Sequence, residues 1–314
     1  MPLLSIIIPC YYNEKNIPVT AKRLLDCEKL FPVDTAFEYV MVDDGSKDGT
    51  YDALVKFHNE NPTKVKVIKL AGNVGSYNAI LAGMSEASGD CNCVITADMQ
   101  DPPELIPEMY AFWQKGIKLV MANRAHREES FFKTFFSSVY HNLVRKFAIK
   151  NIPKGGFDFV LFDKQLREEV VKMNEKNTNT LYLLPWLGYE YVTIPYVRKE
   201  REIGKSKWTL SKKLNLFIDS FVSFTVFPLR IVTGIGFLMG LGTIIYAFIL
   251  LGLKLSGKTN VEGWTAMMLA FLIVSSFQMI ALGIIGEYLW RTLDSVRKRP
   301  VYVIDSVIQP EPKK

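Results

Sequence analysis

Short apolar segments alternate with amphipathic segments along the chain up to about residue 122. Runs rich in β-branched and other apolar residues predict buried strands at residues 3–9, 37–42, 65–70, 91–97 and 117–122. Apolar residues recur at helical spacing between them, at residues 17–30, 50–59, 75–87 and 102–115. Strands that alternate with helices favour an α/β fold with a mainly parallel sheet and helices on its faces. Ligands of such sheets bind beyond the carboxyl ends of the strands.

Two long apolar runs follow, at residues 231–253 and 263–286, and neither contains a charged residue. A bilayer core needs about 20 apolar residues, so the runs predict a transmembrane hairpin. Basic residues flank the pair on both sides, which favours a cytoplasmic location for both ends. We therefore predict a multi-pass protein of the inner (cytoplasmic) membrane. Its parts would be a cytoplasmic catalytic domain with amphipathic interfacial helices (1–215), a juxtamembrane segment with the two helices (216–290) and a cytoplasmic tail (291–314).

Residues 131–150 form an aromatic-rich apolar stripe at helical spacing, with basic residues on the opposite side. Such a helix suits a membrane interface, and it equally suits packing on the core of the sheet. The stretch 198–213 carries seven Lys or Arg and two Glu, so it favours an anionic partner, either phosphates or a lipid surface. We expect no nucleic-acid partner.

The cysteines and histidines do not suggest a metal centre. The four cysteines have no CxxC pair and no zinc spacing, which indicates reduced thiols in the core. His58, His126 and His141 are interpreted as surface residues.

Two acidic clusters follow predicted strands. Asp43-Asp44-Gly45-Ser46 offers carboxylates that could bind ribose or a base, although such a segment is also typical of a plain turn. Asp98 and Gln100 follow the fourth strand, and their oxygens suit Mg²⁺ or Mn²⁺. Asp101 before Pro102 is typical of a helix N-cap, and we expect it to cap while Asp98 binds metal.

The ordered set of motifs resembles the family 2 glycosyltransferases over the whole predicted head. The motifs are residues 5–9 followed by 11–14, the run 43–50, Asn73-Val74-Gly75 and the run 98–104. Residues 156–163, residues 198–207 and the hairpin narrow the resemblance to polyprenyl-phosphate glycosyltransferases, which include bactoprenol glucosyltransferases and dolichyl-phosphate mannose synthases.

The resemblance implies a GT-A fold and an inverting, metal-dependent transfer of one hexose, glucose or N-acetylglucosamine. The donor would be a nucleotide-sugar, UDP-linked, and the acceptor a polyprenyl (undecaprenyl) phosphate whose product serves cell-envelope glycan modification. Mg²⁺ or Mn²⁺ is the implied cofactor, and a homo-oligomer, a tetramer in the family, is the implied assembly.

The resemblance also assigns roles to individual residues. Asp158 and Asp98 would be catalytic, and Asp98 and Gln100 would bind the metal. Asp163 is the alternative if Asp158 has no role. The donor site would contain Pro9, Tyr11, Glu14, Asp44 and Asp98. The acceptor phosphate would contact Arg124, Arg127, Lys133, Arg201, Ser206 and Lys207.

Three positions depart from the family pattern. Thr96 stands where the family has the first acid of Asp-x-Asp, Ser76 stands where a Lys is common, and the Tyr11–Glu14 run is open to a one-residue shift in register. Alternative functions are a catalytically weak scaffold that binds nucleotide-sugars and a mannose- or aminoarabinose-type transferase of the same fold. A processive synthase is disfavoured because the chain has no Gln-x-x-Arg-Trp motif.

Overall fold

The computed structural model describes residues 1–98, 100–124, 152–153, 157–176, 178–197, 222, 224–256 and 263–312. The chain divides into two compact units. The first, here called the head, comprises Met1–Phe221 and Pro300–Lys314, and the second comprises Val222–Arg299. The head therefore contains both ends of the chain. The predicted amphipathic segment 131–150, His126 and His141 lie outside the described residues.

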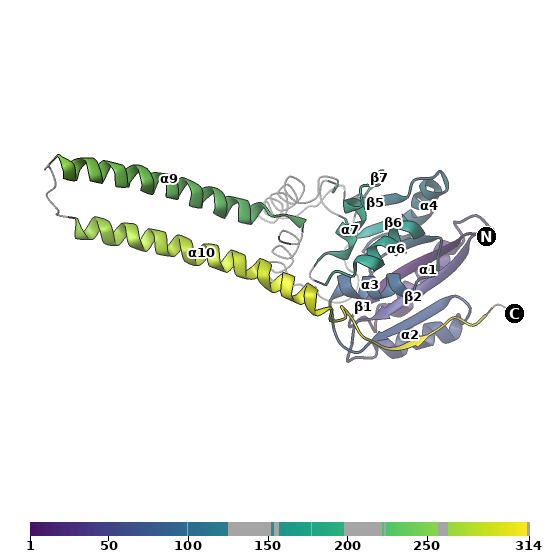
Figure 1. The fold of residues 1–314 in the computed structure, drawn as a ribbon. Coiled ribbons are helices and arrows are strands. Elements are labelled where there is room, and N and C mark those ends of the chain that lie inside the picture. The colour runs from purple at the N-terminus through teal and green to yellow at the C-terminus, as the bar shows by residue number, and fades with distance from the viewer. Residues whose placement is uncertain are drawn as a thin grey trace. The chain divides into compact units, whose positions relative to one another are not determined.

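An eight-stranded sheet forms the centre of the head, in the order β7-β5-β6-β4-β1-β2-β3-β8 (Figure 1). Strands β1 to β4 are parallel to one another, β5 is parallel to β7, and β6 and β8 are antiparallel to their neighbours. The bounds are β1 Leu3–Cys10, β2 Ala36–Asp43, β3 Val65–Leu70, β4 Cys91–Val94, β5 Leu119–Arg124, β6 Phe159–Asp163, β7 Tyr191–Tyr196 and β8 Ile304–Ile308. The predicted α/β class with a mainly parallel sheet is confirmed, and so are all five predicted strands.

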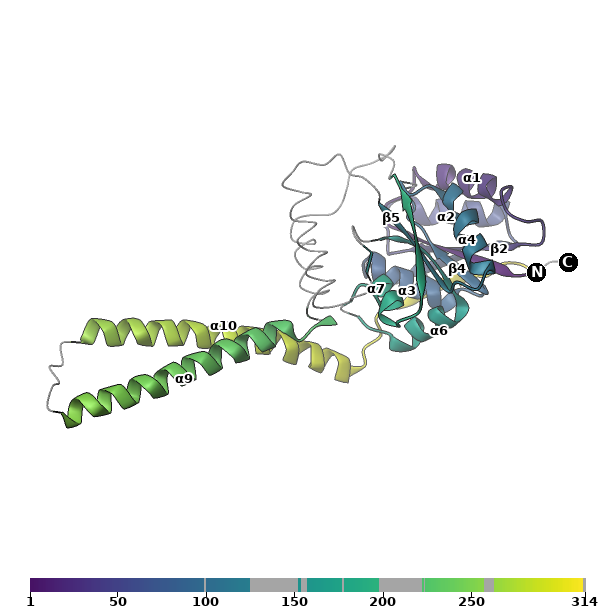
Figure 2. The ribbon, with the colours of Figure 1, turned by 90° about the horizontal axis from the view of Figure 1, so that it is seen from above.

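Helices cover both faces of the sheet (Figure 2). One face carries α1 (Ile17–Glu28), α2 (Thr50–Glu60) and α4 (Ile106–Gln114), whose apolar side chains form one core cluster with β1, β2 and β4. The other carries α3 (Ser76–Glu86), α6 (Lys164–Met173) and α7 (Thr180–Trp186). The α3 helix lies very close to β1, because a Cβ on Gly83 would come 2.5 Å from Cγ2 of Ile7. The helices predicted from periodicity are confirmed, and the fourth begins with a short 3₁₀ turn at Pro103–Leu105.

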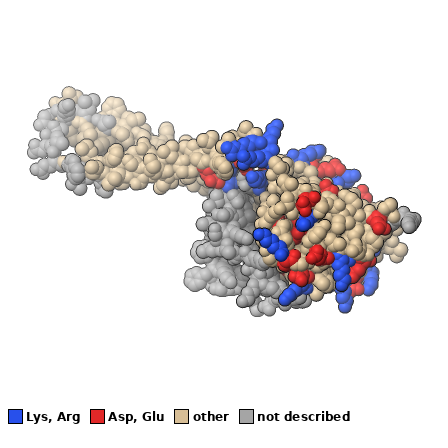
Figure 3. Space-filling model, turned by 90° about the horizontal axis from the view of Figure 1, so that it is seen from below, with Lys and Arg blue, Asp and Glu red and all other residues tan. Residues whose placement is uncertain are grey.

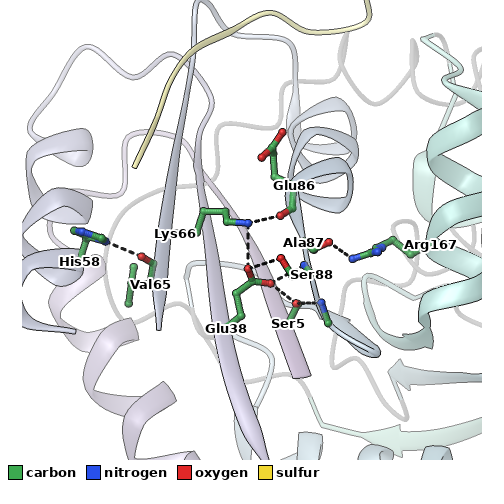
Figure 4. Close-up of polar contacts among 10 residues, drawn as sticks. Ser5, Glu38, His58, Val65, Lys66, Glu86, Ala87, Ser88 and Arg167 are labelled. Carbon is green, nitrogen blue, oxygen red and sulfur yellow. Dashed lines mark hydrogen bonds and ion pairs between the residues drawn. The ribbon is translucent and has the colours of Figure 1, made fainter. Parts of the chain in front are cut away.

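A buried polar network ties the turn after α3 to the amino-terminal end of the sheet (Figure 4). Glu38 of β2 pairs with Lys66 of β3 at 3.1 Å and accepts from the backbone N–H of Ser88 at 2.8 Å. The hydroxyl of Ser5 on β1 also donates to Glu38, and Lys66 donates to the carbonyl of Glu86. The network holds α3 at the end opposite to the carboxyl ends of the parallel strands.

His58 and the cysteines show how well burial could be predicted from the sequence. His58 on α2 is buried, and its Nδ1 lies 2.6 Å from the carbonyl of Val65, so the prediction of a surface residue was wrong. Helix α2 packs on β3, and this contact encloses the imidazole. All four cysteines are free and buried, which confirms the prediction of core thiols.

The second unit is a pair of long helices, α9 (Phe227–Leu255) and α10 (Trp264–Arg297), which contain the two predicted apolar runs apart from Gly263, the N-cap of α10. Their most apolar parts, Phe227–Leu250 and Ala270–Arg297, have mean hydropathies of 1.9 and 1.8, and none of the residues in the most apolar windows is buried. Figure 3 shows this surface almost free of charge along most of its length. By length and composition, both helices could cross a membrane.

Candidate functional site

The carboxyl ends of β1, β2 and β4 meet at one edge of the sheet, and the start of β6 lies at the same edge. Cys10 at the end of β1 pairs with Asp43 at the end of β2. Because β4 and β6 are antiparallel with Val94 opposite Val160, the segment after β4 runs beside the residue that precedes β6. That residue is Asp158. The fold therefore brings the acidic clusters and Asp158, which are far apart in sequence, to one edge.

The loops after β1 and β2 are bonded to each other. Tyr12 adopts a left-handed conformation with φ of 54°, and its N–H donates to Ser46 Oγ at 3.0 Å. Glu14, a predicted donor residue, accepts from the N–H of Gly49 at 3.3 Å. Desolvation raises the pKa of the Tyr11 phenol above its usual value. Pro9 is the partly buried next-to-last residue of β1.

Asp44 joins the end of β2 to the loop between β3 and α3. Its Oδ1 accepts from the N–H of Val74 at 2.7 Å, and its Oδ2 accepts from Asn73 Nδ2 at 2.8 Å and from the N–H of Gly75 at 3.1 Å. Its side chain is almost fully buried. Asp44, assigned to the donor site by resemblance, is thus also the residue that shapes the loop at residues 73–75.

Asp43 was left out of the predicted site, and the structure gives a reason to include it. Its side chain is fully buried, Oδ1 accepts from the N–H of Ser46 at 3.3 Å, and Oδ2 has no hydrogen-bond partner among the residues that the structure describes. Desolvation raises the pKa of this carboxyl. A buried acceptor without a partner costs free energy, so it suits a ligand that brings a donor. The adjacent acid pair in the sequence was the available signal.

Asp98 belongs to a network of hydroxyls and carboxylates after β4. The Oγ1 of Thr96 lies 2.8 Å from Asp98 Oδ1 and 2.9 Å from Asp101 Oδ2. A hydroxyl has one proton, so Thr96 can donate to only one of these two carboxylates at a time. The hydroxyl of Tyr196 on β7 donates to the other oxygen of Asp101.

Asp101 therefore has a different role from the predicted helix cap. The 3₁₀ turn begins at Pro103 with Pro102 as its N-cap, and no side-chain capping bond is present there. Asp101 is fully buried, and its oxygens bind the hydroxyls of Thr96 and Tyr196. The contact with Tyr196 joins residues 95 positions apart in the chain, and no local pattern could indicate it.

The side chains of Asp98 and Gln100 fit a hard divalent cation. Both are partly buried at the sheet edge and carry oxygen donors, which Mg²⁺ and Mn²⁺ prefer. Among the described residues no three His, Cys, Asp or Glu side chains cluster as a closed metal cage. The donor set therefore resembles the few-ligand sites that Mg²⁺ shares with water and substrate phosphates.

Asp158 and Asp163, the two carboxylates considered for catalysis, lie at opposite ends of β6. Asp158 precedes the strand and is partly exposed at the edge with Asp98. Asp163 ends the strand opposite Cys91, caps α6 by accepting from the N–H of Gln165 at 2.9 Å, and accepts from Trp113 Nε1 at 2.9 Å. Asp163 therefore supports α6 at the end of β6 away from Asp98, and it stays the carboxylate to examine only if Asp158 has no role.

Of the six predicted phosphate-binding residues, the structure describes the backbone of one. Arg124 ends β5 opposite Tyr196 of β7, at the same edge as Asp101. Arg127, Lys133, Arg201, Ser206 and Lys207 lie outside the described residues, so their roles stay predictions.

The chain is similar to known glycosyltransferases over nearly its whole length. A family model described as Glycosyl transferase family 2 matches residues 5–172. The chain is 36% identical over 301 residues to an uncharacterized glycosyltransferase, YkcC, of Bacillus subtilis (strain 168), covering 96% of this chain and 92% of that protein. It is 32% identical over 306 residues to the prophage bactoprenol glucosyl transferase homolog of Escherichia coli (strain K12), covering 97% and 99%. It is 31% identical over 303 residues to the bactoprenol glucosyl transferase of Shigella phage SfII, covering 96% and 97%.

Proposed function

This chain belongs to glycosyl transferase family 2 and is a glycosyltransferase, and from this premise we propose that it glycosylates a polyprenyl phosphate. The proposed reaction moves one hexose, glucose or N-acetylglucosamine, from a UDP-sugar to undecaprenyl phosphate with inversion. The observation that carries the proposal is the similarity to bactoprenol glucosyl transferases, which spans 97% of the chain and therefore includes the apolar hairpin as well as the head.

The hairpin supports a lipid acceptor. Large apolar side chains are exposed along it, with Phe237 at 71% and Phe271 at 63%, and such a surface is unfavourable in water. The chain enters the hairpin from the head and returns to the head at β8, so both ends of the hairpin would lie on one side of a bilayer. Arg297 ends α10, and Lys298 and Arg299 follow it, which favours the cytoplasmic side.

The chemistry of the proposed acceptor explains the character of the site. A phosphate monoester has a second pKa of about 6, so it is mostly a dianion at neutral pH and needs little help from a base. One of its oxygens would attack the anomeric carbon, and the bond from that carbon to the donor diphosphate would break with both electrons leaving on the nucleoside diphosphate. A single displacement of this kind inverts the anomeric centre.

The main obstacle is the approach of two anions, and the proposed roles follow from it. Asp98 and Gln100 would hold Mg²⁺ or Mn²⁺, which neutralises the donor diphosphate when bound. Thr96 and Asp101 would orient Asp98 through the hydroxyl network described above. The basic residues predicted at 124–133 and 201–207 would hold the acceptor phosphate, and Asp158 would position the acceptor complex.

A donor screen tests the proposed reaction. Membranes containing the protein would be incubated with undecaprenyl phosphate, Mg²⁺ and single UDP- or GDP-sugars, and the glycolipid would be identified by mass. We expect one donor, UDP-glucose or UDP-N-acetylglucosamine, to give a product heavier than the acceptor by that one sugar residue. A glycolipid formed from GDP-mannose, or one that carries aminoarabinose, would identify one of the alternative transferases. No glycolipid from any donor would refute the proposal and favour the scaffold.

Cysteine labelling of intact cells tests the proposed topology. The four native thiols give low background because they are buried, and burial raises the pKa of Cys27 to about 12. A cysteine at position 258, between the helices, should react with an impermeant maleimide, whereas one at position 47 in the head should react only after lysis. The opposite pattern would refute a cytoplasmic head.

A further inference from the structure

The segment that follows the hairpin is part of the sheet. Strand β8 pairs antiparallel with β3, with Ile308 opposite Val67 and Ser306 opposite Lys69. The register shifts between Lys69 and Leu70, next to Asp305 on β8, as in a β-bulge. Without β8, β3 would be an unpaired edge strand, because the sheet order places it between β2 and β8. Residues 304–308, which lie in the predicted C-terminal tail, thus form the outer strand of the head's sheet next to β3.

Side chains attach β8 to the helices on both faces of the sheet. Asp305 lies 3.6 Å from Lys69, and the ammonium of Lys69 lies 4.8 Å above the ring of Tyr51 on α2. Tyr302 donates to Ser85 of α3 at 2.8 Å. The ion pair is largely exposed and contributes little stability by itself, so the backbone pairing is the stronger link.

The pairing between β3 and the segment after the hairpin continues to Ala71, the first residue of the loop at residues 71–75 that Asp44 shapes. The N–H of Ala71 donates to the carbonyl of Val303 at 2.9 Å, directly before β8. Asp44 holds the other end of this loop through Asn73, Val74 and Gly75. The loop between these attachments is thus fixed from two sides, by the end of β2 and by the segment after the hairpin.

The middle of the loop depends on both attachments. Gly72 has open space around its Cα, and Gly75 has a φ of +89°, so the local sequence restricts the backbone little. Gly45 faces the loop closely, because a Cβ there would meet the carbonyl carbon of Gly72 at 2.6 Å. Residues 71–72 therefore pack directly against the turn after β2, next to Asp43 and Asp44, so movement of this part of the loop toward Gly45 is limited.

We propose that β8 is a positioning element of the donor site, which holds the loop at residues 71–75 in place for nucleotide-sugar binding. The proposal rests on the proposed function, because it takes Asp44 as part of the nucleotide-sugar site that the family resemblance assigns. Release of β8 leaves Ala71 without its partner and leaves Asp44 alone to hold a glycine-flanked loop. The consequence is weaker donor binding with little change in the chemical step.

Two adjacent proline substitutions in the full chain test this role. The N–H groups of successive strand residues point to opposite edges, so one of Ser306→Pro and Val307→Pro removes a bond to β3 and the other does not. Ser306→Ala and Val307→Ala report the loss of the side chains alone. The readouts are the Kd for UDP with Mg²⁺, the KM and kcat for the sugar donor, and hydrogen exchange of residues 71–75.

We expect the disruptive proline to raise the Kd for UDP and the donor KM about five- to tenfold, with kcat within about twofold. Exchange at residues 71–75 should accelerate in that variant, while the other proline and both alanine variants stay near wild type. Wild-type Kd and exchange in both proline variants would overturn the proposal. Faster exchange with an unchanged Kd would also overturn it, because β8 would then hold a loop that the donor does not need.

The same measurements separate this proposal from the proposed reaction. A wild-type protein that binds UDP but forms no glycolipid would contradict glycosylation of polyprenyl phosphate and leave the role of β8 intact. If the wild type binds GDP instead of UDP, the same comparison is made with GDP. A global loss of stability is recognised by accelerated exchange of β1 and β4, which are separated from β8 in the sheet by β2 and β3.

Discussion

Replacing Glu38 by leucine should destabilise the head strongly while leaving the donor site unchanged. The carboxylate of Glu38 is shared by Lys66 at 3.1 Å, the N–H of Ser88 at 2.8 Å, the hydroxyl of Ser88 at 3.1 Å and the hydroxyl of Ser5 (Figure 4). The side chains of Glu38 and Lys66 are 7% and 5% exposed, so water cannot replace the lost partner.

The magnitude follows from this burial. Removing one partner of a buried ion pair costs about 3–5 kcal/mol, because the remaining charge stays desolvated. Lys66→Met should cost less, about 2–3 kcal/mol, because Glu38 would keep its hydrogen bonds from Ser5 and Ser88. The double variant leaves no buried charge, so the two effects should be coupled by about 2 kcal/mol.

The buried cysteines provide an assay that reports the head alone. All four lie in the head, and none lies in the hairpin, so pulse labelling of thiols across a urea series measures the unfolding of the head in detergent. Lys29→Met is the matched control, because Lys29 and Asp26 form an ion pair at 2.6 Å with side chains 74% and 54% exposed. This control should shift the free energy of unfolding by at most about 0.5 kcal/mol.

A small effect of Glu38→Leu would contradict the stabilising role of the buried pair. If Glu38→Leu changes the free energy of unfolding as little as Lys29→Met does, the Glu38–Lys66 pair does not stabilise the fold. Below the unfolding transition, the Kd of the Glu38 variant for UDP should match wild type, because the network lies at the opposite end of the sheet. A weaker Kd there would show that the network and the site are coupled.

Three further predictions concern the site itself. Asp98→Ala should abolish transfer and Mn²⁺ binding, whereas Thr96→Asp should keep or raise activity; equal rates of Asp98→Ala and wild type across a Mg²⁺ titration would contradict the metal site. Asp158→Asn should keep UDP binding, and kcat should fall about 10²–10⁴-fold if Asp158 acts as a base, with a residual rate that rises with pH. A fall in kcat below about threefold would exclude both a catalytic and a positioning role for Asp158. Asp43→Asn should raise Tm at pH 7, because burial raises the pKa of the Asp43 carboxyl in the folded protein above its value in the unfolded chain, and the free energy of unfolding of the wild type therefore falls as pH rises through these two values. The difference in Tm between variant and wild type should disappear below about pH 4, where the carboxyl is protonated in both states. A difference in Tm that does not change with pH would contradict this.

Local patterns in the sequence were sufficient for features that depend on neighbouring residues. The apolar runs at residues 3–9 and 65–70 form β1 and β3, and the uncharged runs 231–253 and 263–286 form most of α9 and α10. Both clusters of acids follow strands in the sequence, and parallel strands align their carboxyl ends, so their meeting at one edge could be predicted.

Features that depend on long-range pairing were decided only by the tertiary structure. Asp101 reads locally as a helix cap, yet Tyr196 binds it from β7. Asp163 follows Asp158 by only five positions, yet the length of β6 puts it at the far end of the strand, where it caps α6. Residues 304–308 are too short and too polar for a strong strand pattern, and they form β8 because β3 offers an open edge. Periodicity reports which face of an element is buried, whereas the partner and register of each strand are set by the packing of the whole sheet.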